Sequence, residues 1–273
     1  MLDKGYYRNR HHDVMEDTYQ RCSTDCVLRD AVSKSIKEEY VVFEDDMAFK
    51  DYKPVSNPNM KVLVTKRKTL VAAKSYKNSK VCALDFANCH SPGGSPWSSG
   101  AQEESLCQVS TLYPCIFAQQ TPYFVKHVNE FKCGAIDHMG TDDMIYVPDV
   151  LVFKDDESSS PYKDLDRADW YGVDIIVAAA PELFGPYDIK EYEKVMTKRI
   201  KRILDIADKA KVQSLVLGAF GCGAFNNPPK VVAKIFASLI RSYSFDTVEF
   251  AVYCRSDDTN YQVFREVIAN DDI

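Results

Sequence analysis

Apolar residues along the chain fall into short continuous runs separated by longer stretches with helical spacing. The short runs predict strands, at residues 62–65, 80–87, 173–180, 212–220 and 247–254. The longer stretches predict helices, at residues 69–76, 102–116, 188–210, 228–243 and 258–269. A further stretch, 144–153, is expected to form a strand pair or one bent strand, because Pro148 interrupts it. Strands that alternate with helices indicate an α/β fold, with helices on both faces of a sheet.

The first 60 residues depart from this alternation. Residues 13–40 mix apolar with charged positions and predict one or two helices, and residues 44–60 are expected to be irregular. We therefore expect residues 1–60 to form an N-terminal helical extension that packs on a core domain of residues 61–273. Further along, the acidic stretch 155–169 predicts a solvated loop.

The segment 84–106 (LDFANCHSPGGSPWSSGAQEESL) is the most informative part of the chain. It reads as a strand end, a turn at Gly93 and Gly94, a loop of small residues, and a helix that opens with Glu103 and Glu104. Glycines allow backbone N–H groups to approach an anion, and a helix N-terminus adds its positive dipole end. Two adjacent carboxylates there suggest a site that holds phosphate and performs acid–base chemistry beside it.

A second segment, 212–236, repeats the order of strand, glycine-rich loop and helix. The chain has only 11 glycines. The two loops contain Gly93, Gly94, Gly100, Gly218, Gly221 and Gly223. Both loops follow strands, and ligands of open α/β sheets bind at the carboxyl ends of strands. The second loop lacks the Gly-Lys-Ser/Thr of a P-loop and matches only part of a dinucleotide fingerprint.

Composition and charge narrow the classes of function. At 273 residues with 45% hydrophobic content, the chain is one large or two small domains with a sizeable core. The net charge of −6 offers no basic footprint for nucleic acid, although loop N–H groups can bind an anion without Lys or Arg. No apolar run is long enough for a membrane span, and the polar N-terminus is not a signal peptide.

The nine cysteines are scattered, and several lie inside apolar strands. This pattern favours reduced thiols in an intracellular compartment, so we expect a cytoplasmic protein, or a nuclear one in a eukaryote. Cys22 and Cys26, with His11 and His12, could form a metal site, but their spacing is loose and helical cysteines more often face a core. We therefore expect no metal and no cofactor.

In combination, LDFAN…PGG…GAQEESL and LGAFGCGAFNNPP resemble the poly(ADP-ribose) glycohydrolases, especially their compact microbial type. The spacing from the glycine run to Gln-Glu-Glu fits that family, and the resemblance covers roughly residues 60–255. It implies a macrodomain-like mixed sheet with helices on both faces, extended by N-terminal helices. The implied activity is that of a glycosidase that hydrolyses O-glycosidic ribose linkages of poly(ADP-ribose) or related substrates and releases ADP-ribose.

The resemblance also implies roles for individual residues. Glu104 would be the catalytic acid/base, Glu103 and Asn88 would hold ribose hydroxyls, and Gln102 would help to position the substrate. Phe225 would pack on bound ADP-ribose, and Tyr253 would stack on its adenine. The implied diphosphate cradle and its neighbours are Gly93, Gly94, Ser95, Gly218, Gly221, Cys222, Gly223 and Ala224.

One position departs from the family pattern, because Ser95 stands where the third glycine of the run is expected, and Pro96 follows it. A Cβ at positive φ is strained, and a residue before proline is pushed towards extended geometry. We therefore expect this loop to take an altered path around the substrate. A non-catalytic ADP-ribose reader is the alternative that this departure leaves open, and a scaffolding α/β domain is a third.

The residues also support cleavage of a ribosyl bond independently of the resemblance. Cleavage of a ribosyl bond needs a proton donor for the leaving oxygen and a base for the attacking water. Because Glu103 and Glu104 are adjacent, their side chains leave a helix about 100° apart, so we expect one to catalyse and the other to anchor. Their repulsion is expected to raise the pKa of one of them. The acceptor atom, the choice of polymeric or single ADP-ribose units and the oligomeric state stay open, with a monomer favoured.

Overall fold

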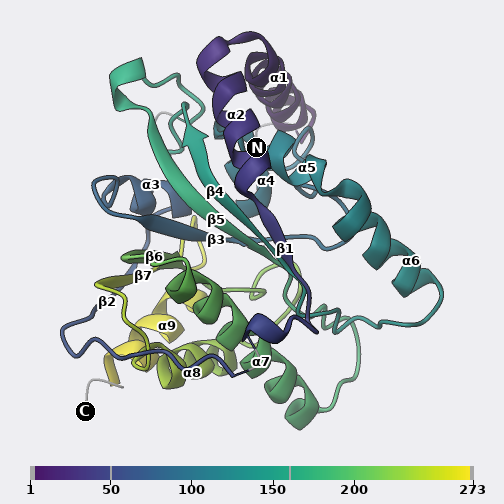
Figure 1. Cartoon of the computed structure of the whole chain (residues 1–273), viewed down its shortest axis with the longest axis vertical. Helices are drawn as coiled ribbons and strands as arrows, with labels where there is room; N and C mark the ends of the chain where they lie inside the picture. Colours follow the sequence, from purple (N-terminus) through teal and green to yellow (C-terminus); the bar gives the residue numbers. More distant parts are fainter. Residues whose placement is uncertain (1–3, 50, 160, 271–273) are drawn as a thin grey trace.

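The computed structural model describes residues 4–49, 51–159 and 161–270 and shows one mixed sheet (Figure 1). In spatial order the strands are β1 (Tyr40–Val42), β4 (Met144–Val152), β5 (Tyr171–Ala178), β3 (Val81–Phe86), β6 (Ser214–Leu217), β7 (Thr247–Ala251) and β2 (Lys61–Thr65). The pairs β1–β4 and β4–β5 are antiparallel, and the pairs from β5 to β2 are parallel. The carboxyl ends of β3, β6 and β7 therefore meet at one edge.

Helices cover both faces of this sheet, as the alternation predicted. They are α1 (Lys4–Thr24), α2 (Cys26–Glu38), α3 (Thr69–Lys74), α4 (Gln102–Val109), α5 (Leu112–Ala118), α6 (Lys126–Lys132), α7 (Ile189–Lys209), α8 (Pro229–Ile240) and α9 (Thr259–Asn270). Single 3-10 turns lie at η1 (Met47–Phe49) and η3 (Arg167–Asp169), and a π-helical segment lies at η2 (Gln120–Val125). Figure 1 shows α7, α8 and α9 on one side of the sheet and α1, α2, α4 and α5 on the other.

Successive residues of the central strand β3 divide between the two faces. Cys82 and Leu84 belong to the cluster that α7, α8 and α9 cover, whereas Val81 and Ala83 belong to the cluster under α3, α4 and α5. Burial on both faces explains why the inner strands read as continuous apolar runs. The helix expected at 188–210 is confirmed with its N-cap, since the Asp188 side chain accepts hydrogen bonds from the N–H groups of Lys190 and Glu191.

Some elements differ from the sequence prediction. The helix expected at 102–116 is two helices, because the chain is extended at Ser110, whose hydroxyl then accepts a hydrogen bond from the Leu112 N–H. The stretch around Pro148 is one strand with a bulge between Val147 and Val150. The helical segment from η2 to α6 was not anticipated.

The N-terminal region is joined to the sheet. Tyr40–Val42 pairs with β4 as an edge strand, and Met15 of α1 is fully buried in the core under α4 and α5. The buried ammonium of Lys154 donates a hydrogen bond to Thr18, which ties α1 to the end of β4. The domain boundary at residue 60 stays a prediction. Within the described ranges, no helix has both the length and the apolar character needed to cross a membrane.

Candidate active site

A cavity of about 790 Å³ opens at the carboxyl ends of β3, β6 and β7. Each strand end contributes to the lining: Phe86 at the end of β3, Ala219 after β6 and Tyr253 after β7. The first residues of α4 also border the cavity. Its remaining walls come from α1, the start of α3, the loop after β4, and α9 with the loop before it, and include His11, Lys68, Asp156, Tyr162, Arg255 and Asn260. The cavity therefore lies where the two glycine-rich loops predicted a ligand site.

The first glycine-rich loop turns tightly over the start of α4. Gly93 and Gly94 both have positive φ, 68° and 66°. A Cβ on Gly94 would lie 2.7 Å from Oε1 of Glu104 and 2.8 Å from Oε2 of Glu103. Side chains larger than hydrogen are excluded there by both the backbone conformation and the two carboxylates.

The two glutamates are buried, with 5% of Glu103 and 9% of Glu104 exposed. Oε2 of Glu103 accepts a hydrogen bond of 2.9 Å from the N–H of Asn88, and Oε1 of Glu104 accepts one of 3.2 Å from the N–H of Ser95. Although their side chains leave the helix in different directions, both carboxylates reach the same glycine. The two carboxylates therefore lie together at this glycine, beside the cavity rather than among its lining residues.

The surroundings of Glu103 change the pKa of its carboxyl group. Burial, and then the neighbouring Asp85, raise the pKa of Glu103 well above its usual value, and Glu104 adds a smaller contribution. Repulsion between the glutamates thus acts in the predicted direction, but desolvation is the larger cause. The neutral form of Glu103 that these neighbours favour can donate a hydrogen bond as well as accept one.

Asp85 is a further carboxyl group of the site that the sequence analysis did not single out. It lies in β3, is fully buried, and neither of its carboxyl oxygens has a hydrogen-bond partner among the described residues. Burial, and then the charge of Glu104, raise its pKa well above the usual value. The signal available in the sequence was a single acidic residue inside the apolar run KVCALDFA, where an unpaired charge is costly.

Gln102 lines the cavity, but its amide group is engaged with β3 and α3. Its Oε1 accepts a hydrogen bond from the N–H of Phe86, and its Nε2 donates to the carbonyl of Leu84 and the hydroxyl of Thr69. Asn88 is engaged in a similar way, because its Oδ1 accepts from the N–H groups of His90 and Ser91. Both side chains thus anchor the loop and the helix.

The second glycine-rich loop contains glycines of two kinds. A Cβ on Gly218 would clash with the ring of Phe86 and the carbonyl of Ala251, and one on Gly221 (φ 71°) would clash with Ala180 and Asn227. These two positions need glycine for close packing. A Cβ on Gly223 would meet nothing within 4 Å, and Gly223 lines the cavity.

Several backbone N–H groups of this loop have no acceptor within the described protein. The N–H groups of Gly221, Gly223 and Ala224 donate to no acceptor in the described part of the chain, whereas that of Cys222 donates to the carbonyl of Ala219. Burial raises the pKa of the Cys222 thiol to about 12, which disfavours the reactive thiolate form. At the opposite wall, the N-cap of α4, Ala101, supplies no side-chain hydrogen bond to the first turn of the helix.

The remaining predicted residues are placed as follows. Tyr253 lines the cavity, is 39% exposed, and accepts a hydrogen bond from the Ser158 hydroxyl at its phenol oxygen. The ring of Phe225 is half-buried against the core and is not among the residues that line the cavity, so its contact with ADP-ribose stays a prediction. Ser95 is not among the described residues with positive φ, so the strain expected there is absent.

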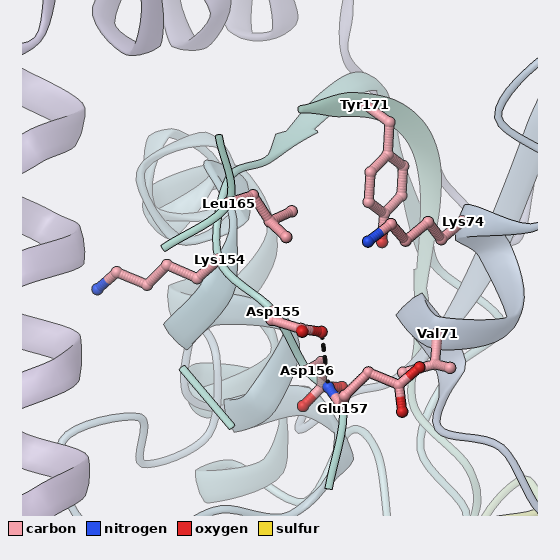
Figure 2. Close-up of a pocket in the computed structure, with 8 residues that line it drawn as sticks. All are labelled: Val71, Lys74, Lys154, Asp155, Asp156, Glu157, Leu165 and Tyr171. Atoms are coloured by element: carbon pink, nitrogen blue, oxygen red, sulfur yellow. Dashed lines mark hydrogen bonds between the residues drawn. The ribbon is translucent and has the colours of Figure 1, made fainter. Parts of the chain in front are cut away.

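The acidic loop after β4 is largely exposed, as its composition predicted, with one buried exception. Asp156 is 4% exposed, and its carboxylate pairs at 2.7 Å with the ammonium of Lys68 on the cavity wall. Figure 2 shows Asp155, Asp156 and Glu157 beside Val71 of α3, with the Glu157 N–H donating to the Asp155 carboxylate. The expectation of a solvated loop is therefore confirmed for most of the described residues within 155–169, and Asp156 is the exception because its carboxylate faces inward to a cation.

The side chains considered above as possible metal ligands do not lie together in the structure. His11 contacts Gln108 and Tyr162 in the cavity wall, whereas Cys22 packs in a separate cluster with Leu28 and Phe153. Among the residues that the structure describes, no group of three or more His, Cys, Asp or Glu side chains is arranged to hold a metal ion.

Comparisons with known proteins agree with the class that this fold and site define, a macrodomain-like glycohydrolase. Residues 2–155 match the family model described as microbial-type PARG, catalytic domain, where PARG is poly(ADP-ribose) glycohydrolase. The match covers more than half of the chain. The chain therefore belongs to the microbial-type poly(ADP-ribose) glycohydrolase family.

Solved structures are similar over almost the whole chain. Poly(ADP-ribose) glycohydrolase from Thermomonospora curvata, bound to the inhibitor ADP-HPD, has 24% identity and a TM-score of 0.81 over 94% of this chain and 98% of that one. The enzyme from Deinococcus radiodurans in complex with ADP-ribose has 26% identity and a TM-score of 0.75 over 88% and 97%. No curated protein sequence matches.

Proposed function

We propose that this glycosidase hydrolyses the O-glycosidic ribose linkages of poly(ADP-ribose) and releases ADP-ribose, with Glu104 as its acid/base. The family assignment supports the reaction. The observation that carries the assignment of roles is the convergence of the Glu103 and Glu104 carboxylates on Gly94, at the start of α4 beside the cavity. A protein that only binds ADP-ribose needs the loops but has no use for this buried pair.

The two glutamates take different roles. Glu104 is the less buried of the two, and in the protonated state it would give its proton to the leaving ribose oxygen, then accept one from the attacking water. Glu103 is tied to the backbone of Asn88 and has a raised pKa. Its other oxygen, Oε1, is buried without a partner among the described residues, which suits a hydrogen bond to a ribose hydroxyl.

The diphosphate of the ligand would lie between the second glycine-rich loop and the N-terminus of α4. The diphosphate would accept hydrogen bonds from Gly221, Gly223 and Ala224, whose N–H groups donate to no described residue. The first turn of α4 adds its dipole from the other side. Tyr253, at the cavity wall, has the exposure needed for an adenine ring to stack on it.

The surroundings of the enzyme are also proposed. Several of the nine cysteines are buried free thiols, including Cys82, Cys107 and Cys115, which is typical of an intracellular compartment. The substrate would be ADP-ribose polymer or an ADP-ribosylated macromolecule, and a monomer presents all the site residues named above.

One assay tests this function against the reader alternative. The protein is incubated with labelled poly(ADP-ribose) and, separately, with a mono-ADP-ribosylated protein, and free ADP-ribose is measured. Release from the polymer that is lost in Glu104→Gln is the expected result. Tight binding of ADP-ribose without release by the wild type would instead identify a reader.

A further inference from the structure

A cluster of aromatic rings lies behind the first glycine-rich loop. Trp97 of the loop packs edge-on against Tyr113 of α5, with ring centroids 5.0 Å apart, and Tyr19 of α1 packs on both at 6.1 and 5.9 Å. Phe117 extends the cluster by stacking on Tyr113 at 5.8 Å. The Trp97 indole N–H donates a hydrogen bond of 3.4 Å to Glu16 of α1. This cluster joins the loop to α5 and to α1, which is distant from it in the sequence.

The cluster also touches the turn that faces the glutamates. A Cβ on Gly93 would lie 3.0 Å from the ring of Tyr113, so the turn rests directly on that ring. The next residue, Gly94, meets the two carboxylates, and the N–H of Ser95 donates to Glu104. A displacement of Trp97 and Tyr113 would therefore move the adjoining turn, and with it the hydrogen bond from the Ser95 N–H to the carboxylate of Glu104.

A second attachment holds the same loop from the helix side. Gln108 lies one turn after Glu104 in α4 and is fully buried. Its Nε2 donates to the carbonyls of Pro96 and Ser99, at 2.6 and 2.8 Å, so both peptide groups flanking Trp97 and Ser98 are tied to α4. The loop has no regular secondary structure, and such a segment keeps one conformation only through contacts of this kind.

We propose that Trp97 is a positioning residue of the active site, which holds the Gly93–Ser95 turn in register with Glu104. Trp97 is not among the residues that line the cavity, and it acts through Tyr113 and the loop backbone. This inference rests on the proposed function, since it gives Trp97 a part in the same reaction. It also assigns α1 a part in catalysis, through Tyr19 and Glu16.

The test compares substitutions of the two tryptophans of the chain. Trp97→Ala is expected to lower kcat by about 10- to 100-fold with a much smaller change in KM, because small displacements of catalytic groups are costly. Trp97→Phe keeps a ring against Tyr113 and is expected to restore most of kcat. Trp170→Phe is the matched control, because Trp170 is also half-buried but packs on Phe153, away from the cavity.

Rates are measured below the melting temperature of each variant, so that loss of folded protein does not lower kcat. Wild-type turnover in Trp97→Ala would overturn the inference while leaving the proposed function intact. A defect in Trp97→Phe as large as in Trp97→Ala would overturn it as well, as would a comparable defect in Trp170→Phe. If the wild type neither releases nor binds ADP-ribose, the proposed function fails first and the inference falls with it.

A second measurement does not depend on turnover. In Trp170→Phe, Trp97 is the remaining tryptophan, so its fluorescence reports on the loop alone. ADP-ribose is expected to shift this emission with the same midpoint as binding measured by calorimetry. Calorimetric binding without a change in emission would show that the loop does not respond to the occupied site, and would overturn the inference.

Discussion

The two glycine-rich loops border one cavity but are held in opposite ways. In the first loop, side-chain oxygens of Asn88, Glu103 and Glu104 accept hydrogen bonds from backbone N–H groups. In the second loop, the side chain of Asn227 donates to the carbonyls of Gly221 and Phe225, and N–H groups of the loop are left without a protein acceptor among the described residues.

This difference indicates that the first loop serves the acid–base chemistry and the second loop serves anion binding. A loop whose N–H groups already donate to carboxylates has few of them left for a diphosphate. A loop with free N–H groups and no acidic side chain attracts an anion but transfers no protons. Changes in the first loop should therefore alter turnover, and changes in the second should alter affinity.

The largest expected effect is that of Glu104→Gln. The amide keeps the shape of the carboxyl group but cannot transfer the proton, and loss of a general acid/base costs about 10²–10⁴-fold in rate. Affinity for ADP-ribose should stay close to that of the wild type by calorimetry. Glu193→Gln, an exposed position of α7, is the control. If Glu104→Gln turns over normally, the acid/base is another residue.

Gly94→Ala should also abolish most turnover. The added methyl would need space that the two carboxylates occupy, at 2.7 and 2.8 Å, so the glutamates must move. Gly134→Ala is a matched control, because Gly134 has a similar φ of 75° but open space around its Cβ position. Both variants carry the backbone strain of about 1–2 kcal/mol. Equal activities of the two variants would show that contact with the carboxylates is unimportant.

Phe225→Ala tests the second loop and is expected to weaken ADP-ribose binding by about 1–2 kcal/mol, roughly tenfold in Kd, with kcat on polymer little changed. Because the ring is also half-buried against the core, a small drop in melting temperature is expected. Phe184→Ala, at an exposed phenylalanine, controls for loss of a ring. Unchanged affinity with a large loss of stability would make Phe225 a core residue only.

The pH dependence of stability should reveal the raised pKa of Asp85. Its pKa is raised in the folded state, so its contribution to stability is fully present below its unfolded pKa and is lost as pH rises through the folded value. Asp85→Asn should therefore melt at a higher temperature than the wild type at pH 8, and the difference should shrink towards pH 5. Asp13→Asn, an exposed position of α1, should show no such trend. A constant difference across this range would place the Asp85 pKa outside it.

The smallest effect is expected from Ser95→Gly. The sequence suggested that a side chain there diverts the loop, but Ser95 is not among the described residues with positive φ, and its N–H still reaches Glu104. Rates on polymeric and mono-ADP-ribosylated substrates should stay within about twofold of the wild type, since surface changes usually contribute little. A large change in preference between the substrates would restore the earlier hypothesis.

Much of the fold was predictable because its signals are local. Continuous apolar runs identified the buried strands, and Asp188 and the two prolines at the start of α8 marked helix starts. The break at Ser110 was not predictable from spacing, because it depends on contacts with β4: the Thr111 hydroxyl accepts a hydrogen bond from the N–H of Leu151. The same is true of β1, whose short run becomes a strand only beside β4.

The sequence by itself determined which groups could do chemistry: two glutamates at a helix start, two glycine-rich loops after strands, and a family resemblance carried by both. Only the tertiary structure decided how these groups are used. It buried Asp85 behind the glutamates, engaged Gln102 with β3, and left Gly223 rather than Gly218 facing the cavity. The physical reason is that helix starts and turns depend on neighbouring residues, whereas burial, pKa and free hydrogen-bonding capacity depend on segments far away in the chain.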